Sequence, residues 1–85
     1  MEKHTSHKAI LKRLKRANGH LLAVIGMIEQ ERPCLDLAQQ LHAVESAISN
    51  AKRELIHDHI EHCLEGEDSA SRAALAELKQ LAKYL

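Results

Sequence analysis

Apolar residues recur in the first third of the chain at alternating spacings of four and three positions. These residues are Ile10, Leu14, Ala17, Leu21, Val24 and Ile28. The spacing places them along one face of a helix and is typical of helices that pack lengthwise against one another. The pattern therefore predicts a helix over residues 6–30.

The same spacing returns after an interruption at Glu31, Arg32 and Pro33. The apolar residues of this second stretch are Leu37, Leu41, Val44, Ile48, Ala51 and Leu55. Proline suits the first turn of a helix, where its missing N–H would have no partner. We therefore expect Pro33 in the first turn of the second helix, Cys34 at the helix start, and a helical pattern that persists to about Leu64.

A third, shorter helix is predicted beyond Gly66, because polar residues that cap helices precede another apolar stripe. The candidate caps are Asp68, Ser69 and Ser71, and the stripe is Leu75, Leu78, Ala82 and Leu85. Nothing along the chain indicates a strand or a linker between domains. The sequence predicts a single all-α domain over residues 1–85.

Two long helices joined by about three residues must fold back on each other as an antiparallel hairpin. Residue n of the first helix then lies beside roughly residue 64 minus n of the second. Each helix carries an apolar seam, and two hairpins that pair into a four-helix bundle are the simplest way to cover both seams. We expect the third helix to pack outside this bundle or to bridge two dimers.

Chain size also favours self-association. The chain has 85 residues, with Tyr84 as its single aromatic residue, so its core must be aliphatic. A domain this small buries only about 60% of its unfolded surface and commonly gains further burial from partners. Neither a deep catalytic pocket nor a catalytic arrangement of side chains is predicted, so we expect no enzyme and no small-molecule substrate. No membrane-spanning run or signal-peptide core is found, and we expect a cytoplasmic protein.

Charge is distributed unevenly, although 12 basic residues balance 12 acidic ones. Residues 1–16 carry a net charge of +5 and residues 54–85 a net charge of −4. The basic residues of the first helix are Lys12, Arg13, Lys15 and Arg16, and the hairpin places Lys52 and Arg53 roughly opposite them. With no aromatic residues interleaved for stacking on single strands, this patch favours double-stranded DNA gripped through its phosphates. The alternative is a solvated helix face.

Cysteine and histidine residues suggest a metal site. His59 and Cys63 are four residues apart, so both lie on one helix face at a spacing that lets them share a metal ion. Cys34 is the obvious third ligand, but it precedes His59 by 25 residues, which is about 37 Å along a helix. If the second helices of two chains run antiparallel about a two-fold axis, Cys34 of one meets His59 and Cys63 of the other. The sequence thus predicts two equal intersubunit sites per dimer.

Two thiolates and one imidazole suit soft or borderline metal ions. Three ligands satisfy Cu(I), whereas Ni(II), Co(II) and Zn(II) require a fourth, which His4 or His7 can supply from the facing end of the first helix. The alternative is that both cysteines are packed in the core and that the histidines are solvated. We interpret His20 and His42 in this second way, as histidines that bind no metal.

Together these features resemble the CsoR/RcnR family of small all-helical bacterial regulators, named after the copper-sensitive operon repressor and the nickel/cobalt repressor. The resemblance rests on Lys12-Arg13-Leu14-Lys15-Arg16 followed by Gly19, on Pro33-Cys34, on Gln39-Gln40-Leu41, and on the ligand spacing of Cys34, His59 and Cys63. It implies a dimer of antiparallel hairpins, usually paired into a tetramer, that binds operator DNA without metal and releases it when the inducer binds. It also implies that Arg13 and Arg16 face the DNA.

Within this family the chain most resembles the nickel and cobalt sensors, through His4, His7 and the stretch from His57 to Cys63. Copper sensors share the three ligands but usually add a tyrosine and a glutamate outside the coordination sphere, where Pro33 and Lys79 stand here. We therefore expect a repressor that leaves operator DNA on binding Ni(II) or Co(II) and so derepresses a metal exporter. A Cu(I)-responsive repressor and a cytosolic metal carrier or buffer are the alternatives.

Overall fold

The computed structural model describes residues 6–65 and 71–85, with side chains placed for residues 7–62 and 71–85. These ranges contain three helices: α1 (Ser6–Glu29), α2 (Cys34–Glu65) and α3 (Arg72–Ala82). The predicted all-α fold is confirmed, and the ends of the first two helices fall within one residue of their expected positions. None of the described helices is long and apolar enough to cross a membrane.

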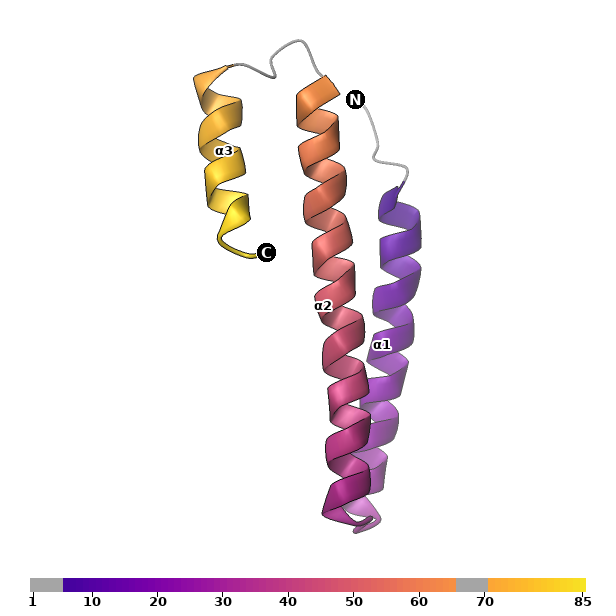
Figure 1. Ribbon diagram of the computed structural model, residues 1–85. Coiled ribbons are helices and arrows are strands. Elements are labelled where there is room, and N and C mark those ends of the chain that lie inside the picture. Colours follow the sequence, from indigo (N-terminus) through magenta and orange to yellow (C-terminus); the bar gives the residue numbers. More distant parts are fainter. Residues whose placement is uncertain (1–5, 66–70) are drawn as a thin grey trace.

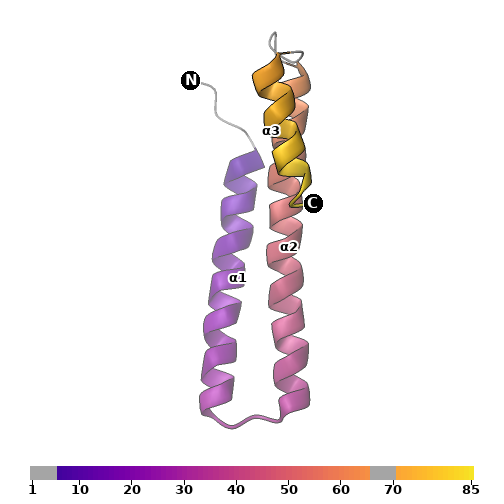
Figure 2. The same cartoon turned by 90° about the vertical axis from the view of Figure 1, so that its left-hand side faces the viewer.

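The two long helices form an antiparallel hairpin, and α3 lies beside the C-terminal half of α2 on the side away from α1 (Figures 1 and 2). The molecule is elongated, with extents of 54 × 24 × 13 Å. Side-chain contacts agree with the expected antiparallel pairing of residue n with about residue 64 minus n to within about one helical turn. His7 faces Asp58, whereas Arg13 reaches Glu54 and His20 reaches Gln40, which lie up to about a turn from the expected positions and in opposite directions along α2.

A tight turn joins the two long helices. The N–H of Arg32 donates to the carbonyl of Met27 (3.1 Å), and the N–H of Glu31 donates to that of Ile28 (3.0 Å). This pair of bonds is a Schellman motif, which requires a left-handed residue, and Glu31 takes that place with φ 57°. Pro33 precedes α2 instead of occupying its first turn, because its carbonyl accepts the first helical bond, from Leu37. Cys34 begins the helix, as predicted.

The start of α3 is capped by Ser71, one of the predicted candidates. The Ser71 hydroxyl accepts a hydrogen bond from the N–H of Ala74 (3.1 Å), which satisfies one of the donors left open at a helix start. No residue of α3 is buried in this chain, although α3 carries an apolar stripe that includes Leu75 and Leu78.

The hairpin buries alternate positions of the two predicted seams, apart from Leu37, which is half-buried. The buried seam residues are Ile10, Ala17 and Val24 on α1 and Val44 and Ala51 on α2. Ile56, five positions after Ala51, is also buried, and it lies about 140° further around α2. The other residues of each seam are therefore not buried in the core of the hairpin.

The unused half of the seams stays in contact with solvent. On α2 it is a row at seven-residue intervals, Leu41, Ile48 and Leu55, with 42 to 45% of each residue exposed. Leu14 and Ile28 form the corresponding row on α1. Contiguous exposed apolar side chains of this kind are a common feature of surfaces that bind other molecules.

Candidate metal centre and DNA-facing surface

The predicted metal ligands occupy the two ends of α2. Cys34 is its first residue and is exposed, whereas His59 lies 25 residues further on with about a third of its side chain exposed. The backbone of Cys63 continues α2 one turn beyond His59, but the Cys63 side chain and the whole of His4 lie outside the described residues. Among the side chains that are described, no three His, Cys, Asp or Glu residues gather as a metal-binding group.

Cys34 belongs to the exposed apolar row of α2. It precedes Leu41 by seven residues, so the row runs Cys34, Leu41, Ile48 and Leu55, and His59 follows Leu55 by four residues. Seven-residue and four-residue steps both keep to one flank of a helix. The two described donors therefore lie at opposite ends of a single flank, with exposed aliphatic side chains between them.

His59 contacts the third helix. Its Nε2 atom contacts Oε1 of Glu77 on α3. Histidines that ligate metals commonly donate their second ring N–H to a carboxylate, which fixes the tautomer and the ring orientation. With Nε2 directed at Glu77, the lone pair of a neutral imidazole lies on Nδ1, which is then the atom suited to a metal.

Glu77 was not anticipated from the sequence. Its contact with His59 joins helices that are separated by residues 66–70, and no spacing rule relates positions across such a connection. The sequence comparison with copper sensors instead singles out Lys79, two residues further along, at the position expected for a glutamate in those proteins. A search of α3 for any carboxylate within a turn of Lys79 would have found Glu77.

His7 lies close to the expected place but does not adjoin His59. Its Nε2 atom is 3.7 Å from Oδ2 of Asp58, and about half of the His7 side chain is exposed. Asp58 and His59 are consecutive on α2, so their side chains point about 100° apart. The structure therefore places His7 near the donor end of α2, on the α1 side.

His20 and His42 have ordinary structural surroundings, as interpreted from the sequence. His20 Nε2 lies 2.6 Å from Oε1 of Gln40, a hydrogen bond that ties α1 to the beginning of α2. His42 Nδ1 lies 3.8 Å from Oε1 of Glu45 on the surface of α2.

The basic residues are all exposed. Lys12, Arg13, Lys15 and Arg16 lie on α1, and Lys52 and Arg53 lie on α2. Between the helices runs a groove of about 360 Å³ that is lined by Arg13, Arg16, Ala17, His20, Ala47 and Asn50. Its lining contains no carboxylate. On its other side, Arg13 forms an ion pair with Glu54, with 2.8 Å between Nη1 and Oε1.

Comparison with known proteins decides the relationship that the ligand spacing and the basic helix suggest. The family model described as "Metal-sensitive transcriptional repressor" matches residues 6–84. The chain belongs to this family. As a metal-sensitive transcriptional repressor it is a regulator of transcription, which agrees with the expectation that it is not an enzyme.

Relatives with similar sequences are named for copper. The copper-sensing transcriptional repressor CsoR of Mycobacterium ulcerans is 39% identical over 79 residues, which cover 91% of this chain and 68% of the relative. CsoR of Bacillus subtilis is 36% identical over 75 residues, which cover 75% of this chain and 74% of the relative. CsoR of Mycobacterium tuberculosis strain H37Rv is 35% identical, and the aligned residues span 66% of its length.

A solved structure of the same family has the same fold. The nickel-responsive transcriptional regulator InrS superposes with a TM-score of 0.82 at 29% identity, covering 100% of this chain and 99% of that one. The metal-sensitive repressor fold is thus common to proteins named for copper and for nickel.

Proposed function

We propose that this repressor binds double-stranded operator DNA without metal and is released from it by Ni(II) or Co(II), which derepresses a metal exporter. The observation that carries the proposal is the single flank of α2 on which Cys34, the exposed aliphatic row and His59 follow one another. That flank provides an assembly surface with metal donors at both of its ends.

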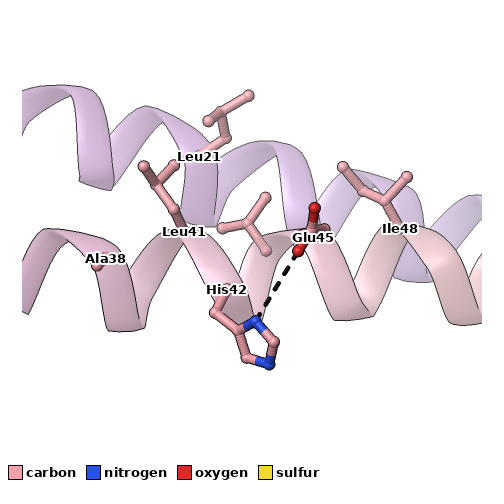
Figure 3. Close-up of a pocket in the computed structure, with 7 residues that line it drawn as sticks. Leu21, Ala38, Leu41, His42, Glu45 and Ile48 are labelled. Atoms are coloured by element: carbon pink, nitrogen blue, oxygen red, sulfur yellow. Dashed lines mark ion pairs between the residues drawn. The ribbon is translucent and has the colours of Figure 1, made fainter.

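A second copy of the chain is the partner that fits this flank. A groove of about 540 Å³ runs along it, and Figure 3 shows Leu21 of α1 beside Leu41 of α2, with Ile48 further along. If two α2 helices pair antiparallel so that Cys34 faces the His59 end, Leu41 meets Leu55 and Ile48 meets the partner subunit's Ile48. The aliphatic residues then cover one another, which a two-fold axis at Ile48 requires.

This pairing makes each metal site intersubunit. Cys34 of one protomer joins His59 and Cys63 of the other, so a homodimer carries two such sites, and dimers can pair further into a homotetramer. Cysteine thiolates and an imidazole are a suitable donor set for Cu(I), Ni(II) and Co(II). The contact between His59 and Glu77 supports a role for His59 as a ligand, because it orients the ring in the way that metal-binding histidines commonly require.

Nickel and cobalt are favoured over copper by the donors near the N-terminus. Ni(II) and Co(II) require at least a fourth ligand. His7 on α1 faces Asp58, the residue before His59, and His4 lies three residues before His7 in the chain. The likeness to InrS, a nickel-responsive regulator, agrees with this choice. The CsoR relatives are named as copper sensors, so a Cu(I)-responsive repressor is the second candidate.

The DNA-facing surface is the basic side of the hairpin. Lys12, Arg13, Lys15 and Arg16 on α1 are joined there by Lys52 and Arg53 on α2. Because α1 carries both this surface and His7, a metal that draws the start of α1 towards the donor end of α2 moves the cations relative to the phosphates.

The proposal is tested by measuring release from DNA and coordination on the same protein. Reduced protein is bound to a labelled duplex that spans the region upstream of its gene, and Ni(II), Co(II) or Cu(I) is titrated while anisotropy is recorded. Absorption spectra report thiolate charge-transfer bands and the d–d bands of Co(II) and Ni(II). We expect Ni(II) or Co(II) to release the DNA. Release by Cu(I) alone establishes the copper sensor, and metal binding without any DNA binding establishes a carrier or buffer.

A further inference from the structure

Arg13 is held by a carboxylate on the neighbouring helix. Its Nη1 atom lies 2.8 Å from Oε1 of Glu54, and about half of each side chain is exposed. By contrast, no ion pair is recorded for Arg16, Lys12 or Lys15 within the described residues. Arg13 therefore differs from the other cations of the basic helix in having an acidic partner in reach.

Arg13 also lies at the boundary between two grooves of opposite character. One is the groove lined by Arg16, His20 and Asn50, which contains no carboxylate. The other, of about 340 Å³, is lined by Ala9, Arg13, His57 and the carboxylates of Glu54, Asp58 and Glu61. The guanidinium is bonded on the acidic side, while the basic side is the one suited to a phosphate.

We propose that Glu54 competes with operator phosphates for Arg13 and thereby holds the affinity of the repressor for DNA below what its basic surface permits. The inference rests on the proposed function, because it requires that Arg13 contact DNA. A guanidinium binds carboxylates and phosphates with the same planar fork. When Arg13 turns to a phosphate it leaves Glu54, whose negative charge then remains close to the DNA backbone.

The competition has a measurable electrostatic consequence. Each cation that neutralises a phosphate releases condensed counterions, which makes the logarithm of affinity fall with the logarithm of salt concentration. An Arg13 that exchanges Glu54 for a phosphate leaves an unpaired carboxylate that attracts cations in turn. The wild-type salt dependence is therefore shallower than it would be without Glu54.

The test compares two variants with the same change of charge. Glu54→Gln removes the partner of Arg13, while Glu61→Gln removes an exposed carboxylate from the same groove that is not bonded to Arg13. An exposed ion pair stabilises by about 0.2 to 1 kcal/mol. We therefore expect Glu54→Gln to bind operator DNA about 1.4- to 5-fold more tightly per Arg13 contact than Glu61→Gln, with a salt slope steeper by up to about 1.

The Arg13→Ala background separates a direct competition from a general effect of charge. If Glu54 acts through Arg13, Glu54→Gln no longer increases the affinity for DNA when Arg13 is already alanine. The effects of the two substitutions on the free energy of DNA binding are then not additive. Circular dichroism and thermal unfolding verify that all variants keep the helical fold.

The outcomes are distinct from those that test the proposed function. If wild-type protein binds no operator DNA, the proposed function fails. If wild-type protein binds DNA but Glu54→Gln has the same DNA affinity and salt slope as Glu61→Gln, the competition is refuted. It is also refuted if Glu54→Gln still increases the DNA affinity in the Arg13→Ala background. Weaker binding by folded Glu54→Gln also refutes it, since Glu54 would then hold Arg13 in its productive position.

Discussion

His7 of α1 faces Asp58 of α2, with 3.7 Å between Nε2 and Oδ2. The contact holds the first turn of α1 against α2, one residue before His59. A metal at His59 that recruits His7 must exchange this contact for a coordination bond. Under the proposed function, that exchange would move the start of the helix whose later turns carry the basic side chains, and would so couple metal binding to DNA binding.

The first prediction concerns the histidines at the start of α1. The double variant His4→Ala, His7→Ala should still bind metal through Cys34, His59 and Cys63, yet stay on DNA when Ni(II) or Co(II) is added. Cu(I) needs no fourth ligand and is unaffected by their loss. Anisotropy on the labelled duplex measures the release. Normal release of this double variant by Ni(II) or Co(II) would contradict the nickel and cobalt assignment.

The second prediction concerns Arg13 and Arg16. Arg13→Ala and Arg16→Ala should each weaken DNA binding and reduce the salt slope by about 1 for each phosphate contact that is lost. Metal affinity should not change, because neither residue lies near the donors. Titrations at several salt concentrations measure the slope. Unchanged slopes in both variants would place the DNA-binding surface elsewhere on the molecule.

A third prediction tests whether Cys34 and Cys63 bind metal in trans. Neither Cys34→Ala nor Cys63→Ala homodimers should contain an intact site. Heterodimers of the two variants, purified through different tags, should recover one intact site of the two, because one site then receives both alterations and the other receives none. Metal stoichiometry measures the recovery. Absence of binding in verified heterodimers would exclude the intersubunit geometry.

The fourth prediction concerns Glu77. Loss of the carboxylate that orients a metal-binding histidine typically lowers metal affinity by about 10- to 100-fold, and we expect a loss of this size for Glu77→Ala. Glu29→Ala, an exposed change of the same charge at the end of α1, serves as the control. Competition with a chelator measures both affinities. Equal affinities would show that Glu77 does not act on the site.

The helices and their pairing were predictable because apolar spacing and a short connection determine them locally. Other features depend on the fold as a whole. The left-handed turn at Glu31 had no sequence signal, since glycine is the residue usually found there. The pairing rule placed Arg13 opposite residue 51, whereas its long side chain reaches Glu54, almost one turn further along α2.

The candidate site was predictable only in part. The spacing of His59 and Cys63 and the distance to Cys34 follow from helix geometry alone. The division of each seam into a buried row and an exposed row could not be predicted, because alternating spacing does not reveal which positions face the hairpin partner. Burial in the structure distinguishes Val44 and Ala51 from Leu41 and Ile48.

The fifth prediction follows from the exposed row of α2. Ile48→Lys should prevent dimerisation, because it places two ammonium groups together at the proposed two-fold axis in an apolar interface. Ala43→Lys introduces the same charge on another exposed face of α2 and should leave the dimer intact. Analytical ultracentrifugation measures the oligomeric state. A dimeric Ile48→Lys variant would mean that another surface forms the dimer.

The length of α2 between Cys34 and His59 has a consequence for the order of events in a cell. Because one rigid helix keeps these donors about 37 Å apart, a newly made chain cannot bring Cys34 and His59 to the same metal ion, and under the proposed pairing assembly must come before sensing. Metal capture then depends on two chains having met. The metal concentration at which repression ends would accordingly fall as the protein becomes more abundant. This threshold concentration would then depend both on the amount of repressor in the cell and on the chemistry of its ligands.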